Sequence, residues 1–223
     1  MIGIFILSLL VGFSGAIVPG PLFALTLKQA LYVGWSAGLW LSIGHMIAEL
    51  ALVIGLKAGL GRILQRPLVT RIIGFVGGIV LLYFAWGMIA VLFTTQSLHA
   101  TASGHTAPLT ITSLTIQGIV LTVVNPYWYI WWATVGVGLI GAQVKSHGER
   151  AWPAFFIGHS MADYVWYIAV SMILAFSGSF LSPAVHRGLI AICGVGVAVL
   201  GIMFIFRQVS SWRQERNFLP AGD

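Results

Sequence analysis

The chain carries little charge, few acidic residues and almost no cysteine. Charged residues make up 7% of its 223 residues, against about 25% in ordinary soluble domains. Five residues are acidic and one is a cysteine, Cys193, which excludes an internal disulfide and a dithiol relay. A His-Glu-x-x-His motif, which a zinc protease of the usual kind would need, is also missing. These absences argue against a soluble protein, a membrane enzyme and a redox conduit, and nothing in the sequence predicts a cofactor.

Long apolar stretches take the place of the missing charge. Hydrophobic residues make up 59% of the chain, and its mean hydropathy is +0.98. Apolar stretches of about 20 residues joined by short polar loops predict an all-α polytopic membrane protein, with the lipid bilayer as a partner. Residues 1–18 lack a basic region and a cleavage site, so they are interpreted as part of the first span. We place six spans, at residues 2–27, 35–56, 72–93, 114–140, 153–176 and 184–206.

The basic residues predict the orientation of these spans. The net charge is +6, but the basic residues lie at helix ends rather than in one patch, so we expect no nucleic-acid partner. If the N-terminus is cytoplasmic, two basic residues (Lys28 and Arg187) fall near the outer face. The other nine fall on the cytoplasmic side: Lys57, Arg62, Arg66, Arg71, Lys145, Arg150, Arg207, Arg213 and Arg216. We therefore expect a multi-pass protein of the cell (plasma or inner) membrane with both termini cytoplasmic.

A six-residue pattern occurs twice. The run Gly-His-Met-Ile-Ala-Glu at residues 44–49 recurs as Gly-His-Ser-Met-Ala-Asp at residues 158–163. The chain then divides into a first repeat (residues 1–93), a loop (94–113), a second repeat (114–206) and a cytoplasmic tail (207–223), within one transmembrane transporter domain. Three spans in each half mean that the halves enter the membrane from opposite sides. Inverted repeats of this kind bind solute and coupling ions near the bilayer midplane.

Each repeat also has a helix-breaking sequence in its first span. One is Pro-Gly-Pro at residues 19–21, and the other is Asn-Pro at residues 125–126. Proline lacks an N–H and clashes with the preceding turn, so both spans should be interrupted inside the bilayer. A broken helix leaves backbone groups that can bind ions and solutes, although a simple kink is the alternative. The Asn125 side chain would either contribute to such a site or only cap the break.

The repeated pattern places a histidine and a carboxylate on one helix face in each half. His45 and Glu49 are four residues apart, as are His159 and Asp163. Charge at the bilayer centre is costly, about 2.5–3.5 kcal/mol on insertion scales, so two matched pairs indicate a function. If the repeats face each other, the four side chains would meet at one site that binds protons or ions. The alternative is that each histidine only satisfies its own carboxylate.

Other features are less specific. An aromatic run would either line a solute path or serve packing and lipid contact: Tyr127, Trp128, Tyr129, Trp131 and Trp132. Gly-x-x-x-Gly spacings at residues 34–38, 55–59 and 74–78 permit close helix approach and leave a homo-oligomer open. His99 and His105 in the polar loop would bind metal or simply be solvated.

The interrupted first span, the following Gly-x-x-x-Gly at residues 34–38 and the Asn-Pro pair resemble the lysine-exporter (LysE-type) translocator family. The resemblance covers nearly the whole chain. It implies a small six-span exporter of amino acids and related metabolites, driven by an ion gradient. The broken-helix core of its translocation site would then comprise Pro19, Gly20, Pro21, Asn125 and Pro126. Family members that export amino acids often continue with Asn-Pro-Lys, whereas Tyr127 follows here, so the solute is left open.

The sequence therefore predicts a secondary transporter that exports a small solute, an amino acid or related metabolite, coupled to a proton or sodium gradient. Glu49 and Asp163 would bind the coupling cation or a substrate ammonium group. The alternative is a transporter of divalent transition metals, because two imidazoles and two carboxylates meeting at one point suit such a metal. Its ligands would be His45, Glu49, His159 and Asp163.

Overall fold

The structure is a computed structural model that describes residues 1–93, 110–177 and 182–218. Within these ranges the chain is helical apart from short connections, and no strand occurs. His99 and His105 lie outside the described residues. The helices are α1 (Ile2–Ala16), α2 (Pro21–Val33), α3 (Ser36–Lys57), α4 (Leu60–Leu64), α5 (Pro67–Ala90), α6 (Ile111–Val123), α7 (Pro126–Trp131), α8 (Val137–His147), α9 (Ala151–Ser177) and α10 (Pro183–Phe218). A 3-10 turn (Val91–Phe93) follows α5, and a π-helical segment, η3 (Trp132–Gly136), joins α7 to α8.

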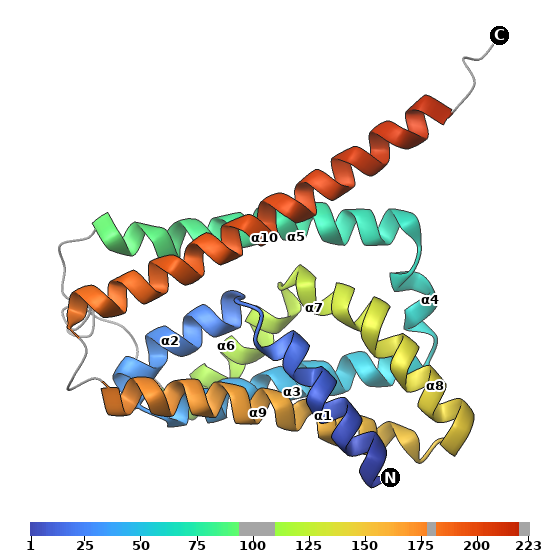
Figure 1. Cartoon of the computed structure of the whole chain (residues 1–223), viewed down its shortest axis with the longest axis horizontal. Coiled ribbons are helices and arrows are strands. Elements are labelled where there is room, and N and C mark those ends of the chain that lie inside the picture. Colours follow the sequence, from blue (N-terminus) through green and yellow to red (C-terminus); the bar gives the residue numbers. More distant parts are fainter. Residues whose placement is uncertain (94–109, 178–181, 219–223) are drawn as a thin grey trace.

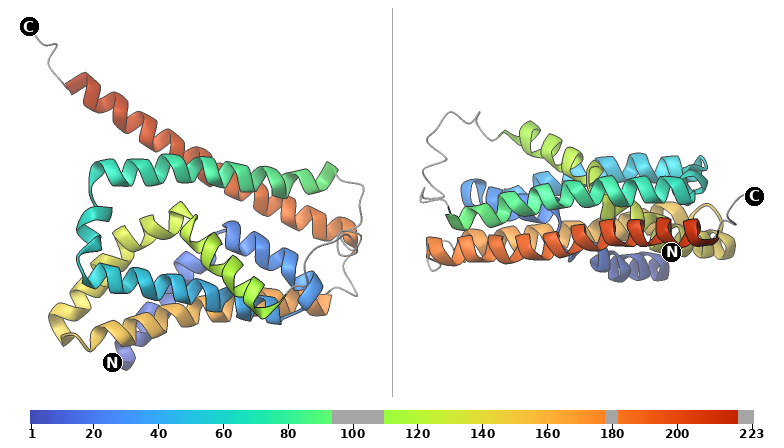
Figure 2. Two further views of the ribbon diagram at one scale, coloured as in Figure 1. Left: turned by 180° about the vertical axis from the view of Figure 1, so that it is seen from behind. Right: turned by 90° about the horizontal axis from the view of Figure 1, so that it is seen from above.

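Both predicted breaks are present. The chain bends by 82° between α1 and α2, where Pro19 and Pro21 offer no N–H to continue the helix. At the second break, α6 ends at Val123 and α7 begins at Pro126, a first-turn position where the missing N–H costs nothing. Figure 1 and the left view of Figure 2 show the two bends side by side in the middle of the molecule, where Asn125 Nδ2 lies 3.4 Å from the position of a Cβ on Gly20.

The helices pack in pairs around these bends. α5 runs along α10, α1 along α9, and α6 along α3, while α3 and α9 lie against each other. Helices α5 and α10 form one side of the molecule in Figure 1. They also cover the breaks: Pro126 packs on Gly77 of α5, and Pro19 lies 3.7 Å from the position of a Cβ on Gly196 of α10.

Three helical segments of the described chain are long and apolar enough to cross a membrane by themselves: α3, α5 and residues Arg187–Ser210 of α10. The bent pair α1 and α2 satisfies the same criterion together, which gives up to four spans. Helix α9 has 27 residues but is not among these segments, because the polar residues His159 and Asp163 lower its mean hydropathy. Helix α6, with 13 residues, is too short to cross a membrane alone. The predicted number of six spans therefore stays a prediction.

Several helix ends lie outside the predicted spans: α5 begins at Pro67 rather than at residue 72, and α8 ends at His147 rather than at residue 140. Helix α2 continues past residue 27 to Val33, and it ends where Gly34 adopts a φ of +67°, a conformation that favours glycine. Helix α10 continues through residues 207–218, the first part of the predicted cytoplasmic tail. This segment contains neither glycine nor proline, so nothing in its sequence ends the helix.

The glycine that opens each repeated motif allows two helices to touch. A Cβ added at Gly44 would overlap the backbone oxygen of Thr115 on α6, and one at Gly158 would overlap Ser8 on α1. Because backbone atoms cannot give way as a flexible side chain can, we predict that Gly44→Ala destabilises the protein by about 1–3 kcal/mol, as overpacking does.

Thermal unfolding in detergent measures this effect, and Gly141→Ala on α8 is the matched control. A Cβ at Gly141 meets no atom within 4 Å, so this replacement should be neutral or stabilising by up to about 1 kcal/mol through helix propensity. Equal melting temperatures for the two variants would contradict the close packing of α3 against α6.

Candidate functional site

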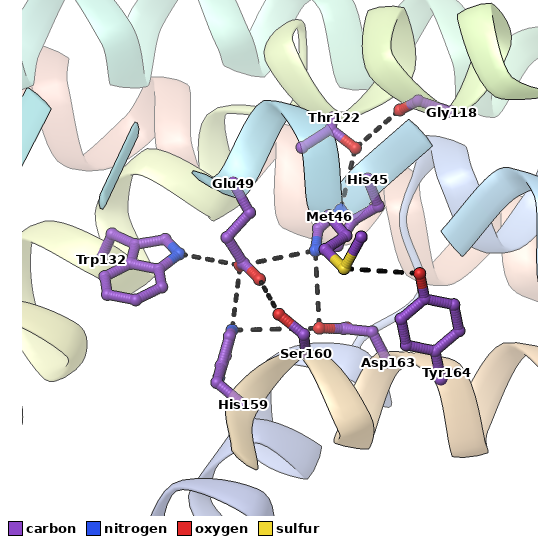
Figure 3. A network of polar contacts seen from close by, with 10 residues as sticks. All are labelled: His45, Met46, Glu49, Gly118, Thr122, Trp132, His159, Ser160, Asp163 and Tyr164. Carbon is purple, nitrogen blue, oxygen red and sulfur yellow. Dashed lines mark hydrogen bonds and ion pairs between the residues drawn. The ribbon is translucent and has the colours of Figure 1, made fainter. Parts of the chain in front are cut away.

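The structure brings the histidine and carboxylate of both motifs together between α3 and α9 (Figure 3). The closest approach crosses from one helix to the other: His159 Nε2 lies 3.0 Å from Glu49 Oε1. His45 Nε2 lies 3.5 Å from both Glu49 Oε1 and Asp163 Oδ2, and His159 Nε2 lies 3.9 Å from Asp163 Oδ2. Each histidine thus contacts the carboxylate of the other helix at least as closely as its own.

All four side chains are buried. Glu49 is fully buried (0% exposed), and the other three residues are 4–8% exposed: His159, Asp163 and His45. Burial of an isolated charge is very costly, so the carboxylates need hydrogen-bond donors or cations close by. The positions and chemistry of these neighbours therefore decide what the cluster can bind.

Glu49 is well supplied with donors. Its Oε1 accepts from the indole N–H of Trp132 at 3.0 Å and contacts His159 Nε2 at the same distance, while Oε2 accepts from the Ser160 hydroxyl at 3.3 Å. Trp132 reaches this position from the π-helical segment η3, and the absence of a side chain on Gly136 leaves room for its ring. These contacts favour a carboxylate at Glu49.

Asp163 has no comparable support. Its Oδ2 is buried and accepts no hydrogen bond from the part of the chain that the structure describes. The difference follows from sequence, because Ser160 in the second motif corresponds to Met46 in the first. Met46 offers only a sulfur acceptor, which takes the Tyr164 hydroxyl at 3.4 Å. The two carboxylates of the repeat are therefore not equivalent.

The two histidines also differ. His45 Nδ1 lies 2.8 Å from the Thr122 hydroxyl of α6, which donates to the Gly118 carbonyl at 2.7 Å. His159 Nδ1 is buried with no hydrogen-bond partner among the described residues, and it faces Gly12 of α1. The Trp131 ring packs over His159, with ring centroids 4.4 Å apart. A hydrogen bond therefore fixes Nδ1 of His45, whose Nε2 lies 3.5 Å from two carboxylates, whereas His159 is held at Nε2 alone.

A cavity connects this cluster to the two helix breaks. It is lined by Pro19 and Gly20 of the first break, by Asn125 of the second, and by side chains of the cluster, including Asp163. The Asn125 side chain caps α7 by accepting from the Tyr127 N–H at 3.1 Å, and its Nδ2 lies 3.4 Å from the position of a Cβ on Gly20. Two further residues of the breaks, Pro21 and Pro126, are fully buried.

The aromatic run is divided between packing and the cavity. Trp128, Trp131 and Trp132 are buried, which contradicts lipid contact for these three. Trp131 donates to the Ser14 hydroxyl at 3.1 Å and lines the cavity with Trp128 and Tyr127.

The geometry also allows a cation. Ligand atoms of His45, Glu49 and Asp163 all lie within 4.8 Å of one another, and these residue types suit a transition metal. A proton, a sodium ion or an ammonium group could equally be balanced by two buried carboxylates.

Sequence reasoning did not find three residues of the site. Ser160 is inside the second motif, and it could have been found because the first motif has Met46, a residue without a hydroxyl, at the same position. Trp132 was named only as part of the aromatic run, and its contact with Glu49 was not predicted. The π-helical segment that orients its side chain has no sequence signature. Thr122 is an ordinary helical threonine until α6 packs on α3.

Comparisons with known proteins agree with this architecture. The sequence pattern of the family described as LysE type translocator matches residues 13–208. The chain is 23% identical to the "Chemotactic transduction protein ChpE" of Pseudomonas aeruginosa, over 91% of this chain and 96% of that protein. It is also 23% identical to the "Leucine efflux protein" of Klebsiella pneumoniae, over 85% of each. No solved structure matches it significantly. The chain belongs to the LysE type translocator family and is a membrane transporter, not an enzyme.

Proposed function

We propose that this protein is a secondary transporter of the cell (inner) membrane that exports an amino acid or related metabolite, coupled to entry of protons or sodium. The observation that carries the proposal is the buried cluster of two carboxylates and two histidines, which faces a cavity between two helix breaks. The resemblance to a protein named for leucine efflux supports an amino acid as the solute.

We further propose that the six spans form two inverted three-helix repeats in one transmembrane domain. Matched contacts support this arrangement: α1 packs on α9 as α6 packs on α3. The motif glycines, Gly44 and Gly158, make these contacts, and each break is covered by the last long helix of the other half. Such pairs of matched contacts are expected when two similar units are related by a twofold axis in the membrane plane.

Both termini would then be cytoplasmic. The ends of α3 and α8, with Lys57 and Lys145, would lie at the cytoplasmic face, where basic residues are favoured. The ion pair between Lys57 and Glu149, at 2.8 Å, would hold the two halves together at that face. It is largely exposed and therefore weak, which suits a contact that opens during transport.

The two carboxylates would have different roles. Glu49, with its donors satisfied, is a fixed negative charge that holds the cluster together. Asp163 Oδ2 accepts no hydrogen bond from the described residues, so it gains most from an arriving cation. We place the exchangeable cation at Asp163 and the solute in the cavity between the breaks. Rocking of one repeat against the other would expose this site to each side in turn.

Transport assays in proteoliposomes test the proposal. Protein reconstituted with an imposed proton or sodium gradient should move labelled leucine, and empty liposomes should not. Other amino acids are screened in parallel to define the solute. If no amino acid or related metabolite moves under either gradient, the proposed export function is wrong.

A second candidate is transport of a divalent transition metal, favoured by the three closely spaced ligand atoms of His45, Glu49 and Asp163. The same proteoliposomes, loaded with a metal-sensitive dye, distinguish it. Movement of manganese, zinc or cobalt without movement of amino acids would support metal transport. The protein would then share the fold of the family but not the export of amino acids. The absence of metal movement would remove this candidate.

A further inference from the structure

Thr122 joins the second helix break to the buried cluster. Its backbone oxygen accepts from the N–H of Asn125 at 3.1 Å, in the turn that interrupts the span. Its side chain, 1% exposed, reaches the other way to His45 Nδ1 at 2.8 Å. One residue therefore contacts both the break and a histidine of the candidate cation site.

The hydroxyl of Thr122 restricts the protonation of His45. A hydroxyl has one hydrogen, and here it is donated to the Gly118 carbonyl at 2.7 Å. Towards His45 the oxygen can then only accept, so Nδ1 must carry a hydrogen. The other nitrogen, Nε2, is left to face Glu49 Oε1 and Asp163 Oδ2, each 3.5 Å away.

We propose that Thr122 is a positioning residue that keeps His45 Nδ1 as a permanent donor, so that the lone pair of Nε2 faces the exchangeable cation at Asp163. This inference rests on the proposed transport function. Without the hydroxyl, a neutral His45 would gain by placing its only hydrogen on Nε2, towards the two carboxylates. Nε2 would then present an N–H where the empty site needs a lone pair to receive the cation.

The surroundings of His45 leave Thr122 as the group that sets this choice. Glu49 on its own helix and Asp163 on α9 both face Nε2, and the Trp128 ring meets the imidazole edge-on at a centroid distance of 6.5 Å. Within the described ranges His159 has no equivalent of Thr122, because Gly12 lies beside its Nδ1. The two buried histidines should therefore be distinguishable by experiment.

Nitrogen NMR of the wild-type protein labelled with 15N-histidine tests the inference directly and needs no solute. The His45 signals are assigned by their loss in His45→Asn. We expect Nδ1 of His45 to be protonated in the wild type and in Thr122→Ser, and to lose its hydrogen in Thr122→Val. An unprotonated Nδ1 in the wild type would overturn the inference, even if the valine variant does not fold.

Transport by the same variants gives the functional readout. Thr122→Val should lower the maximal rate about tenfold, the effect of losing one hydrogen bond of ordinary strength, with a smaller change in the half-saturating solute concentration. Thr122→Ser should restore the rate. Thr26→Val is the matched control, because Thr26 is equally buried and bonds the Leu22 carbonyl at 2.9 Å but has no histidine partner.

The outcomes separate the two proposals. A wild type with protonated Nδ1 that moves no amino acid would contradict the proposed function and not the positioning role of Thr122. Normal transport by Thr122→Val, or a loss in Thr122→Ser as large as in the valine variant, would overturn the positioning role alone.

Discussion

Replacing Glu49 by glutamine should lower solute transport by about a hundredfold or more while the protein still folds. The amide keeps the shape of the side chain: its oxygen can accept from Trp132 and His159, and its NH₂ can donate to Ser160. What is lost is the fixed negative charge. Removing one partner from a buried charged cluster typically costs about 3–5 kcal/mol, and a loss of 3 kcal/mol from the cation-loaded state of the cluster lowers its population by about a hundredfold.

Uptake into proteoliposomes measures this loss, with size-exclusion chromatography as the check on folding. Glu149→Gln is the matched control, since it makes the same change at a carboxylate that is 71% exposed and paired with Lys57. Surface pairs of this kind contribute about 0–1 kcal/mol, so the control should transport nearly normally. Full activity of Glu49→Gln would rule out the buried carboxylate as part of the transport site.

Replacing Asp163 by asparagine should have a different effect. We expect gradient-driven transport to be abolished, because the variant can no longer bind and release a cation at position 163. Exchange of labelled for unlabelled solute should persist, since it needs no net movement of the cation. The expectation follows from Asp163 Oδ2, which is buried and accepts no hydrogen bond from any residue the structure describes.

Counterflow and gradient-driven uptake, measured on the same proteoliposomes, separate the two activities. Asn replaces the carboxylate with a neutral group of nearly equal size, so a packing defect should be small. Ser171→Ala on the same helix α9 is a control for a buried polar replacement outside the cluster. If Asp163→Asn retains gradient-driven uptake, or if it behaves as Glu49→Gln in both assays, the division of roles between the carboxylates is wrong.

Much of this architecture was predictable from residues with strong local effects. Proline lacks an N–H wherever it occurs, so both helix breaks lie where residues 19–21 and 125–126 indicated. The repeated motif showed which histidines and carboxylates share a helix face, because four-residue spacing is a property of any helix. These features depend on the chain near the residue and not on what packs against it.

The remaining features depend on tertiary packing. Thr122 and Trp132 are brought to the cluster by α6 packing on α3 and by a π-helical segment, and neither leaves a signal in one sequence. The unequal support of Glu49 and Asp163 could be traced to Ser160 and Met46 only after their partners were known. The sequence shows Glu49 and Asp163 as matched members of a repeat, whereas their contacts in the structure differ.

The central claim is that the buried cluster couples solute movement to a cation gradient. The most direct test uses proteoliposomes that contain a dye for internal pH or sodium, and follows the dye after addition of the amino acid that the solute screen identifies. Wild-type protein should move the cation in the direction opposite to this solute, and Asp163→Asn should exchange the solute without any cation signal. Solute movement by the wild type without a cation signal, or an undiminished signal in Asp163→Asn, would contradict the account.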